Sequence, residues 1–410
     1  MDDTYLQKFL SDSARRAKRS EIRELLKLTA RPEVISLAGG LPAPETFPVE
    51  EIADMLPGAM RKFGANALQY GTTEGDNGLK EQIIQMMAED GLTGLTPDEV
   101  MITTASQQGL DLVSRVFLAP GDAMICGLPS YLGALSAFNA AGALMNGIPL
   151  DDDGMPPEAL EEQLKSMRER NIEPKLLYLV PDFQNPAGVT LTLPRRKKIL
   201  DIARRYDLLV LEDSPYRQLR FTGENVPNMK SMDEDGRVIS LFTFSKILFP
   251  GLRLGWAVGH PDVIARLVVA KQSVDLCTSA LSQLVAREYL KTGKLPAQLE
   301  RTRGVYREKC EVILKALDDN IDPSWGVKWT RPEGGLFLWM TLPNGLNSKD
   351  LLTHALEENV AFVIGNAFYC DGGGSDTMRL NFSYPSKEQL KTGIERIAKA
   401  IKKLLEEQPA

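Results

Sequence analysis

The chain has 410 residues, of which 43% are hydrophobic and 25% are charged, and its formal net charge is −7. These values are typical of a globular protein with a large core and room for two domains. The acidic balance and the absence of a long basic block argue against a nucleic-acid-binding protein. No apolar run is long enough to span a bilayer, and the N-terminal residues lack the apolar core of a secretory signal. We therefore expect a cytoplasmic protein without a membrane partner.

Histidine and cysteine are scarce and scattered. The two histidines, His260 and His354, have no ligand-like spacing, which argues against a metal site and against Ser-His or Cys-His catalysis. The cysteines form no C-x-x-C pair, so we expect free and mostly structural thiols. They are Cys126, Cys277, Cys310 and Cys370. Acid–base chemistry would have to come from a lysine, a carboxylate or a cofactor.

Between about residues 60 and 290, short apolar runs alternate with longer helical segments. We predict strands at 100–104, 123–126, 176–180, 208–213, 238–242 and 254–258, with helices at 106–118, 131–141, 194–206 and 261–290. Continuous apolar strands that alternate with amphipathic helices are typical of an α/β fold with a mostly parallel sheet covered by helices on both faces.

The pattern changes near residue 293. We predict helices at 295–317, 349–358 and 386–407 and strands at 327–329, 335–340 and 377–382, which together indicate a smaller α+β domain. The expected division is an N-terminal arm with part of the small domain at 1–60, a large domain at 61–292 and the C-terminal small domain at 293–410.

One lysine lies inside a run that should otherwise be buried. In residues 241–258 the only charged residues are Lys246 and Arg253. Burial lowers the pKa of a lysine readily and frees its amine to attack a carbonyl, and the forked arginine side chain suits a phosphate. Pyridoxal phosphate is an aldehyde that carries a phosphate and would satisfy both. The alternative is a lysine that reaches solvent from a strand end beside a structural ion pair, and this run alone leaves both readings open.

Other polar residues follow the predicted strands, where ligands collect in open α/β sheets. Ser106 opens a helix and could bind an anion there, although it could equally be a plain N-cap. Tyr131 would place an aromatic ring at the same edge. Asn185 could donate to a ring oxygen, although Asn-Pro is often just a turn. Asp213 ends a strand, with Tyr216 three residues on. Its carboxylate could hold a protonated pyridine nitrogen, or could form an ordinary salt bridge.

The order of these motifs resembles the fold type I pyridoxal-phosphate aminotransferases of class I/II, and most of all their 2-aminoadipate, kynurenine and aromatic aminotransferase subgroup. The similarity extends over essentially the whole chain. It is carried by SEIRELLKLTARPEVISLAGGLPAPETFP, LQYGTTEGDNGLKE, TTASQQGLDLVSRVFLAPGD, PSYLGAL, PDFQNPAGVT, EDSPYRQLRF, TFSKILFPGLRLGWAVG and MRLNFSY. A single SK or NPAG motif would not be specific for this family, but the whole set of motifs is.

The resemblance implies an aminotransferase that moves an amino group from an L-amino acid to a 2-oxo acid, such as 2-oxoglutarate, by way of pyridoxamine phosphate. Lys246 would carry the cofactor as an imine and move the proton, and Asp213 would hold the pyridine nitrogen. Asn185 and Tyr216 would bind the ring oxygen, and Tyr131 would stack on the ring. The phosphate would be bound by Ser106, Gln107, Thr243, Ser245 and Arg253, with Tyr70 from the second subunit of a homodimer. Arg379, Asn185 and the backbone of Gly40 would bind the substrate carboxylate.

The sequence departs from the common pattern in several places, of which two could affect specificity, and one further arginine is expected to influence substrate choice. Arg217 adds a cation next to Tyr216, and Phe249 adds bulk before Pro250, so either could alter specificity. In the subgroup that the chain resembles, the arginine that matches Arg23 can face the distal carboxylate of glutamate or 2-aminoadipate, or swing aside for an apolar side chain. Arg23 could equally be a solvated arginine paired with a neighbouring glutamate.

Three other functions compete with this one. A lyase or decarboxylase on the same scaffold would use the same Lys246 and Asp213. A non-catalytic aminotransferase-like regulatory domain would follow a winged-helix segment, and the N-terminal arm is expected instead to lead directly into the enzyme. A nucleotide-dependent α/β enzyme is disfavoured, because neither a GK[ST] nor a G-x-G-x-x-G motif accompanies the glycines at 372–374.

Overall fold

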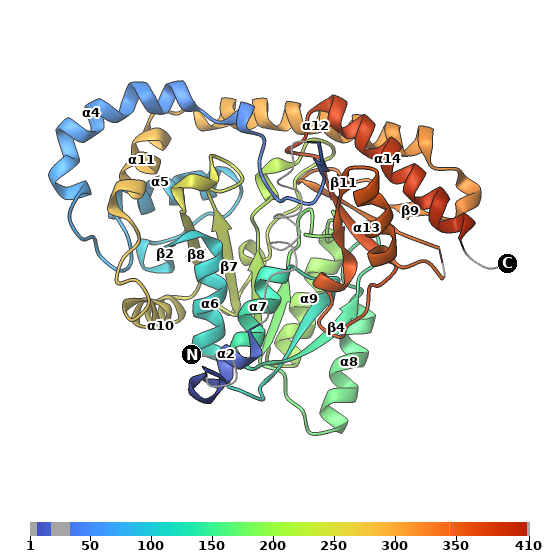
Figure 1. Cartoon of the computed structure of the whole chain (residues 1–410). Helices are drawn as coiled ribbons and strands as arrows, with labels where there is room; N and C mark the ends of the chain where they lie inside the picture. Colours follow the sequence, from blue (N-terminus) through green and yellow to red (C-terminus); the bar gives the residue numbers. More distant parts are fainter. Residues whose placement is uncertain (1–5, 18–32, 344, 408–410) are drawn as a thin grey trace.

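The structure is a computed structural model that describes residues 6–17, 33–343 and 345–407. Its centre is a seven-stranded sheet in the order β2-β8-β7-β6-β5-β3-β4 (Figure 1). The strands are β2 (Val100–Thr103), β3 (Ala123–Leu128), β4 (Leu144–Pro149), β5 (Leu176–Leu179), β6 (Leu209–Asp213), β7 (Val238–Thr243) and β8 (Gly255–Val258). Only β8 runs antiparallel to its neighbours in this sheet, so the predicted mostly parallel sheet is confirmed.

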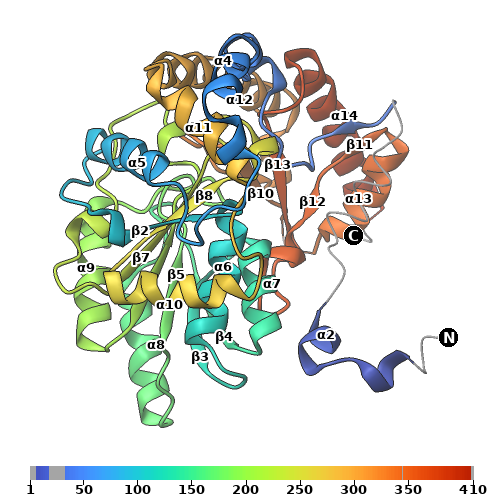
Figure 2. The ribbon, with the colours of Figure 1, turned by 90° about the vertical axis from the view of Figure 1, so that its left-hand side faces the viewer.

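Helices cover both faces of this sheet because successive strand residues point to opposite sides. In β3, Cys126 packs into one apolar cluster with residues of α6 (Ala105–Phe117), α7 (Leu132–Ala141) and α10 (Pro261–Gln272). Its neighbour Ile125 packs into another cluster with α8 (Pro157–Glu169) and α9 (Leu193–Arg205). Figure 2 shows the strands between these two sets of helices. The sheet is therefore buried on both sides.

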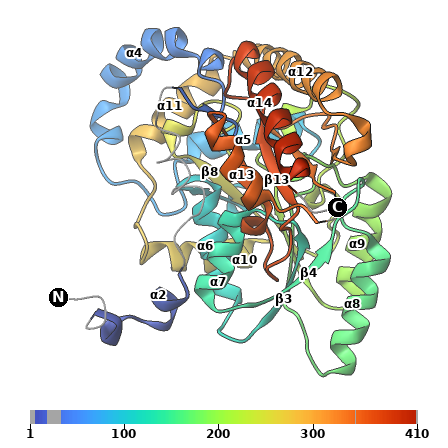
Figure 3. The same ribbon diagram turned by 45° about the vertical axis from the view of Figure 1, so that its right-hand side comes forward.

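A second sheet has four strands in the order β12-β13-β10-β9. They are β9 (Lys328–Trp329), β10 (Phe337–Thr341), β12 (Val363–Ile364) and β13 (Thr377–Asn381). The helices α12 (Leu295–Asn320), α13 (Ser348–Glu357) and α14 (Lys387–Glu406) accompany it, and in Figure 3 α13 and α14 lie in front of β13. The short β1 (Ile35–Ser36) pairs in parallel with β11 (Val360–Ala361), so this strand lies with the C-terminal part.

Three helices near the N-terminus pack against the larger sheet's helices. The short α2 (Asp12–Arg16) contacts α7, where Arg16 donates to the carbonyl of Asn139 at 3.0 Å. The long α4 (Val49–Ala67) packs on α11 (Ala280–Lys291), as does α5 (Asn77–Glu89). The division at residues 60 and 292 stays a proposal, supported by the separation of the two sheets along the chain.

The predicted helix over 261–290 is wrong, because it is two helices. α10 ends at Gln272 and α11 begins at Ala280. Between them Leu276 has φ +62°, a left-handed conformation that interrupts a right-handed helix. Ser279 caps the second helix by accepting a hydrogen bond from the Ser282 N–H at 3.2 Å. Periodicity alone did not reveal this break, since the segment between the two helices contains neither proline nor glycine.

The strand β4 was also missed by the sequence pattern. It pairs in parallel with β3 from Leu144 to Pro149, at the edge of the sheet. Leu144 is exposed and Gly147 interrupts the apolar run, so the segment lacks the continuous apolar character of the central strands. Among the described residues, no helix is long and apolar enough to cross a membrane.

Candidate active site

The polar side chains singled out by the sequence lie at the edge of the large sheet where its parallel strands end. The antiparallel direction of β8 brings its first residue to that edge. Gly255 is paired with Thr103 at the end of β2 and with Thr243 at the end of β7. The turns before β8 and after β2, β6 and β7 therefore converge, as expected for a site in an open α/β sheet.

Asp213 is the buried carboxylate of the site. It ends β6 and is 2% exposed. Its Oδ2 accepts a hydrogen bond from the Tyr178 hydroxyl at 2.9 Å, and within the described chain its Oδ1 has no hydrogen-bond partner. Burial raises the pKa of Asp213 to about 7, and the Tyr178 hydrogen bond opposes that rise. One oxygen is thus available to a donor that the described part of the chain does not supply.

Lys246 follows β7 and has a depressed pKa. Its Nζ donates to the carbonyl of Gly40 at 2.8 Å. Burial lowers the pKa of Lys246 to about 8, and the positive charges of Arg379 and Arg253 contribute to that fall. Because a large fraction of such an amine is neutral near its pKa, it can act as a nucleophile or as a base.

Asn185, Tyr216 and Arg379 form one hydrogen-bonded group. The Asn185 amide donates to the Tyr216 hydroxyl at 3.2 Å and accepts from the Arg379 guanidinium at 2.9 Å. All three side chains are at most 4% exposed. Burial raises the pKa of Tyr216, so its hydroxyl keeps its proton and can donate it to an acceptor.

Arg379 brings a buried cation from the second sheet to the first. It lies on β13 and donates to the carbonyl of Ala38 at 2.7 Å. Its guanidinium lies over the rings of Phe337 and Phe368, with its carbon 4.2 Å and 5.1 Å from their centroids. Burial lowers the pKa of Arg379 to about 10, and its Nε has no partner within the described chain. A buried cation with a free donor is suited to a carboxylate.

The start of α6 forms a narrow cup of backbone and hydroxyl groups. A Cβ on Gly255 would lie 2.7 Å from the Ser106 nitrogen, so only glycine fits beside this turn. In the turn after β7, the Ser245 N–H donates a hydrogen bond to the Thr243 hydroxyl at 3.1 Å. Ala105 and Arg253 both have left-handed φ angles, +61° and +51°. Such conformations in non-glycine residues concentrate at ligand sites.

Tyr131 and Gln107 lie together beside this cup. The Tyr131 hydroxyl donates to the Gln107 side chain at 3.3 Å, and the Gln107 amide donates to the carbonyl of Gly133 at 2.9 Å. A Cβ on Gly133 would come within 2.6 Å of both side chains. Burial, followed by the charge of Asp213, raises the pKa of Tyr131 to about 12.

The roles expected of three further site residues stay predictions. Tyr70 is 79% exposed, on the surface beside α11. The Gly40 carbonyl accepts from Lys246, and its contact with a substrate stays a prediction. Arg23 lies outside the described residues, so its role also stays a prediction.

Tyr178 and Phe368 belong to the site but were not predicted from the sequence. Tyr178 carries the only hydroxyl in the apolar strand β5, which could have marked it as a partner for a buried acid. Phe368 precedes the loop at 369–376 and reaches Arg379 only through the tertiary fold, so the sequence held no signal for it.

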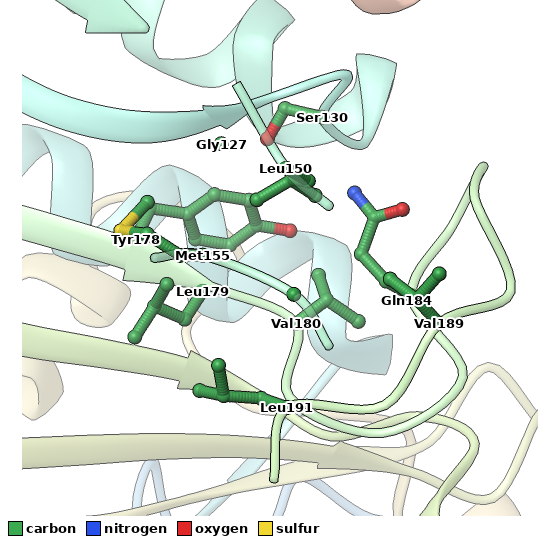
Figure 4. A pocket seen from close by; sticks show the side chains of 11 residues that line it. Gly127, Ser130, Leu150, Met155, Tyr178, Leu179, Val180, Gln184, Val189 and Leu191 are labelled. Carbon is green, nitrogen blue, oxygen red and sulfur yellow. The ribbon is translucent and has the colours of Figure 1, made fainter. Parts of the chain in front are cut away.

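A small cavity lies behind this edge of the sheet, lined by Tyr178, Ser130 and Gln184 among others (Figure 4). The Gln184 amide donates to the carbonyl of Pro129 at 2.9 Å, which joins the loops that follow β3 and β5. The volume is about 20 Å³, enough for a single water molecule and too small for an amino acid. This cavity is therefore not the substrate pocket.

Arg217 does not add a free cation beside Tyr216. Its side chain is 4% exposed and its Nε bonds the Asp90 carboxylate at 2.6 Å. Asp182, which pairs with the fully buried Arg196 at 2.7 Å, lies 3.8 Å away. Arg217 is thus held in a buried ion network that joins α5 to the loop after β6. The ring of Phe249 lies 6.4 Å from that of Phe47, which leaves its suggested effect on specificity a prediction.

Replacing Arg217 with alanine should destabilise the protein by about 3–5 kcal/mol, because the largely buried Asp90 carboxylate would lose its cation, whereas Asp182 would keep Arg196. Denaturant unfolding measures this loss. Arg115→Ala, which removes an exposed ion pair on α6, is the matched control and should have little effect. A change in substrate preference by Arg217→Ala without loss of stability would contradict the structural role.

Replacing Asp213 with asparagine should stabilise the cofactor-free protein above neutral pH. The folded-state pKa of about 7 exceeds the ordinary 3.8, so ionisation of Asp213 costs folded-state stability as the pH rises from about 4 to 7. Urea unfolding should show the variant gaining over the wild type between about pH 4 and pH 7, toward a limit on the order of 4 kcal/mol that stays constant at higher pH. Asp207→Asn, at a fully exposed position, should show no such divergence. A constant difference at all pH values would contradict the buried ionisation.

Comparison with known proteins agrees with this geometry. Residues 32–397 match the family model of aminotransferase class I and II. The aromatic-amino-acid aminotransferase 1 of Thermococcus litoralis is 46% identical over 97% of this chain and 94% of its own length. The 2-aminoadipate transaminase of Thermus thermophilus is 45% identical over 96% of each chain.

Solved structures give the same result. The kynurenine aminotransferase of Pyrococcus horikoshii, in a complex with PMP, superposes with a TM-score of 0.94 at 45% identity, covering 98% of this chain and 99% of that one. The α-aminoadipate aminotransferase of Thermus thermophilus, complexed with N-(5'-phosphopyridoxyl)-L-leucine, gives 0.90 at 42% identity, with 98% and 99% coverage. The predicted type I fold is confirmed, and this chain belongs to the class I and II aminotransferases.

Proposed function

We propose that this aminotransferase uses pyridoxal phosphate to move an amino group from an L-amino acid to a 2-oxo acid such as 2-oxoglutarate, in two half-reactions. The amino acids are glutamate and 2-aminoadipate, together with aromatic or aliphatic ones. The similarity to enzymes named for aromatic amino acids, 2-aminoadipate and kynurenine supports this breadth. The lyase and regulatory alternatives have no comparable support.

The observation that carries the proposal is the set of unsatisfied buried groups at the site. Asp213 Oδ1 needs a donor, and Arg379 Nε needs an acceptor. A protonated pyridine nitrogen would meet the first need and a substrate carboxylate the second. Between them, Lys246 has an amine that is partly neutral, and the start of α6 has free N–H groups suited to a phosphate. These residues therefore fit the cofactor.

When bound, pyridoxal phosphate supplies an electron sink that makes the α-hydrogen of the amino acid acidic. Asp213 would serve this chemistry by keeping a proton on the facing ring nitrogen through its free Oδ1. Tyr178, on the other oxygen, fixes the orientation of the carboxylate. Asn185 and Tyr216 would donate to the ring oxygen opposite, since burial keeps the Tyr216 hydroxyl protonated.

Lys246 would take the proton from the substrate α-carbon on its neutral Nζ and deliver it to the cofactor carbon on the other side of the amino nitrogen. A base with a pKa near the working pH is best suited to such a transfer. Arg379 would orient the substrate by binding its α-carboxylate, with Asn185 holding the guanidinium in place. The rings of Phe337 and Phe368 cover the guanidinium, and this exclusion of water strengthens the pairing with a carboxylate.

We also propose a homodimer in which Tyr70 reaches the phosphate of the second subunit. Large apolar side chains that soluble proteins usually bury are exposed on one region of the surface: Leu68 (72%), Tyr70 (79%), Leu276 (49%) and Leu281 (39%). The two chain segments adjoin, because a Cβ on Gly71 would lie 4.0 Å from that of Ala280. A second copy would cover this region. The cytoplasm remains the proposed location, from the sequence composition.

The cofactor-loaded protein tests the proposed reaction directly. Adding single amino acids should bleach its yellow absorbance, and 2-oxoglutarate should restore it, with the rates ranking the donors. Lys246→Ala is the control, and it should yield no borohydride-trapped adduct by mass spectrometry. Release of product from the amino acid without lasting bleaching would indicate a lyase or decarboxylase, and an undiminished adduct in Lys246→Ala would show that another lysine is used.

Mixed dimers test the role of Tyr70. Tyr70→Ala and Lys246→Ala homodimers should each be nearly inactive if both residues serve every site. Mixing them under subunit exchange should restore activity, because each heterodimer would contain one site with both residues intact. Sedimentation establishes that dimers form. Absence of recovery in mixtures shown to contain heterodimers would contradict the sharing of sites.

A further inference from the structure

The break between α10 and α11 is held by one carboxylate, Asp275. Its Oδ1 accepts a hydrogen bond from the Lys271 ammonium at 2.6 Å. Its Oδ2 accepts from the Thr104 hydroxyl at 2.8 Å and from the Gln108 amide at 2.7 Å. Asp275 thus joins the end of α10 to the turn that leads from β2 into α6, a turn that comes much earlier in the chain.

These bonds fix the turn at which the proposed phosphate cup begins. The Gln108 side chain also accepts from the Thr104 N–H at 2.8 Å, so both residues are held at two points. The next residue, Ala105, has a left-handed φ of +61°, and Ser106 follows. A backbone conformation of this kind persists only where its surroundings impose it. Asp275 is the charged group that binds both Thr104 and Gln108 here.

The partner of Asp275 explains how a carboxylate can lie beneath an anion site. The N–H groups at the start of a helix attract anions, and an uncompensated carboxylate nearby would oppose a phosphate. The Lys271 side chain is 0% exposed and lies 2.6 Å from Asp275, so the pair contributes no net charge. The carboxylate can therefore accept the hydrogen bonds of Thr104 and Gln108 without repelling the ligand.

We propose that Asp275, neutralised by Lys271, is a positioning residue that sets the phosphate cup at Ser106 and Gln107. This inference rests on the proposed binding of the cofactor phosphate there. Asp275 touches neither cofactor nor substrate in this role, and it acts through Thr104 and Gln108. The alternative is that Asp275 and Lys271 form a purely structural ion pair at the end of a helix. In that case, substitution of Asp275 should have no selective effect on phosphate binding.

Two cofactor analogues separate these readings. The dissociation constants of pyridoxal phosphate and pyridoxal, which lacks the phosphate, are measured on the cofactor-free protein, together with competition by inorganic phosphate. Asp275→Ala should raise the dissociation constants of pyridoxal phosphate and inorganic phosphate roughly tenfold or more. The reason is that misplaced N–H donors lose charge-assisted hydrogen bonds to the phosphate. Binding of pyridoxal should stay within about twofold of the wild type.

Asp233→Ala is the matched control. Asp233 also pairs with a nearly buried lysine, Lys230, at 2.8 Å and accepts backbone N–H groups. It lies before β7, at the end of that strand away from Thr243. Loss of this carboxylate should lower stability and leave the ratio of the two dissociation constants unchanged.

A second pair of variants distinguishes a specific effect on phosphate binding from a general folding defect. Lys271→Met leaves the negative charge of Asp275 without its partner, and it should weaken the binding of pyridoxal phosphate more than the binding of pyridoxal. The double variant Lys271→Met/Asp275→Asn removes the charge again, and it should recover part of the phosphate affinity. Equal weakening of both ligands in every variant, or no weakening in Asp275→Ala, would overturn the proposal. Failure of the wild type itself to prefer pyridoxal phosphate over pyridoxal would instead overturn the proposed phosphate site.

Discussion

The site depends on keeping ionisable groups out of water without giving each a partner from the protein. Asp213, Lys246 and Arg379 all have pKa values displaced toward the neutral form, and burial is the first cause in each case. Ordinary buried charges are paired, as Arg196 is with Asp182. At the site, Asp213 and Arg379 each keep one polar atom free. Burial of these unpaired groups costs free energy. A ligand that supplies the missing partners recovers part of that cost when it binds.

Two sheets have to meet for this arrangement to exist. Asp213 and Lys246 lie at the ends of strands of the large sheet, while Arg379 lies on β13 of the smaller one. The contact between them is polar and specific, because Asn185, in the loop after β5, binds the Arg379 guanidinium. The substrate carboxylate would thus bind to one sheet and the cofactor to the other. Any shift of the smaller sheet would move the carboxylate relative to Lys246.

The phosphate end of the site depends on backbone shape rather than on buried charge. Gly255 leaves no room for a side chain beside Ser106, and Ala105 and Arg253 hold left-handed conformations. The polar contacts around Thr104 maintain this shape from outside the cup. The segment that carries Asp275 also carries the exposed Leu276, so the proposed dimer surface and the proposed cup share one short piece of chain. Formation of the dimer would stabilise the same turn.

Local sequence determined much of this protein. Apolar runs ended by polar residues placed Asp213, Asn185 and Lys246 at strand ends, because parallel strands deliver their carboxyl ends to a common edge. Local sequence did not reveal the helix break at 273–279, within which Asp275 binds the distant Thr104 and Gln108. It suggested a free cation at Arg217, which is instead bound by Asp90, 127 residues away. The partnership of Tyr178 with Asp213, and the rings beneath Arg379, likewise required the tertiary structure. The type of a secondary-structure element follows from the pattern of neighbouring residues along the chain. The burial of a side chain, its hydrogen-bond partners and its pKa depend instead on residues that only folding brings together.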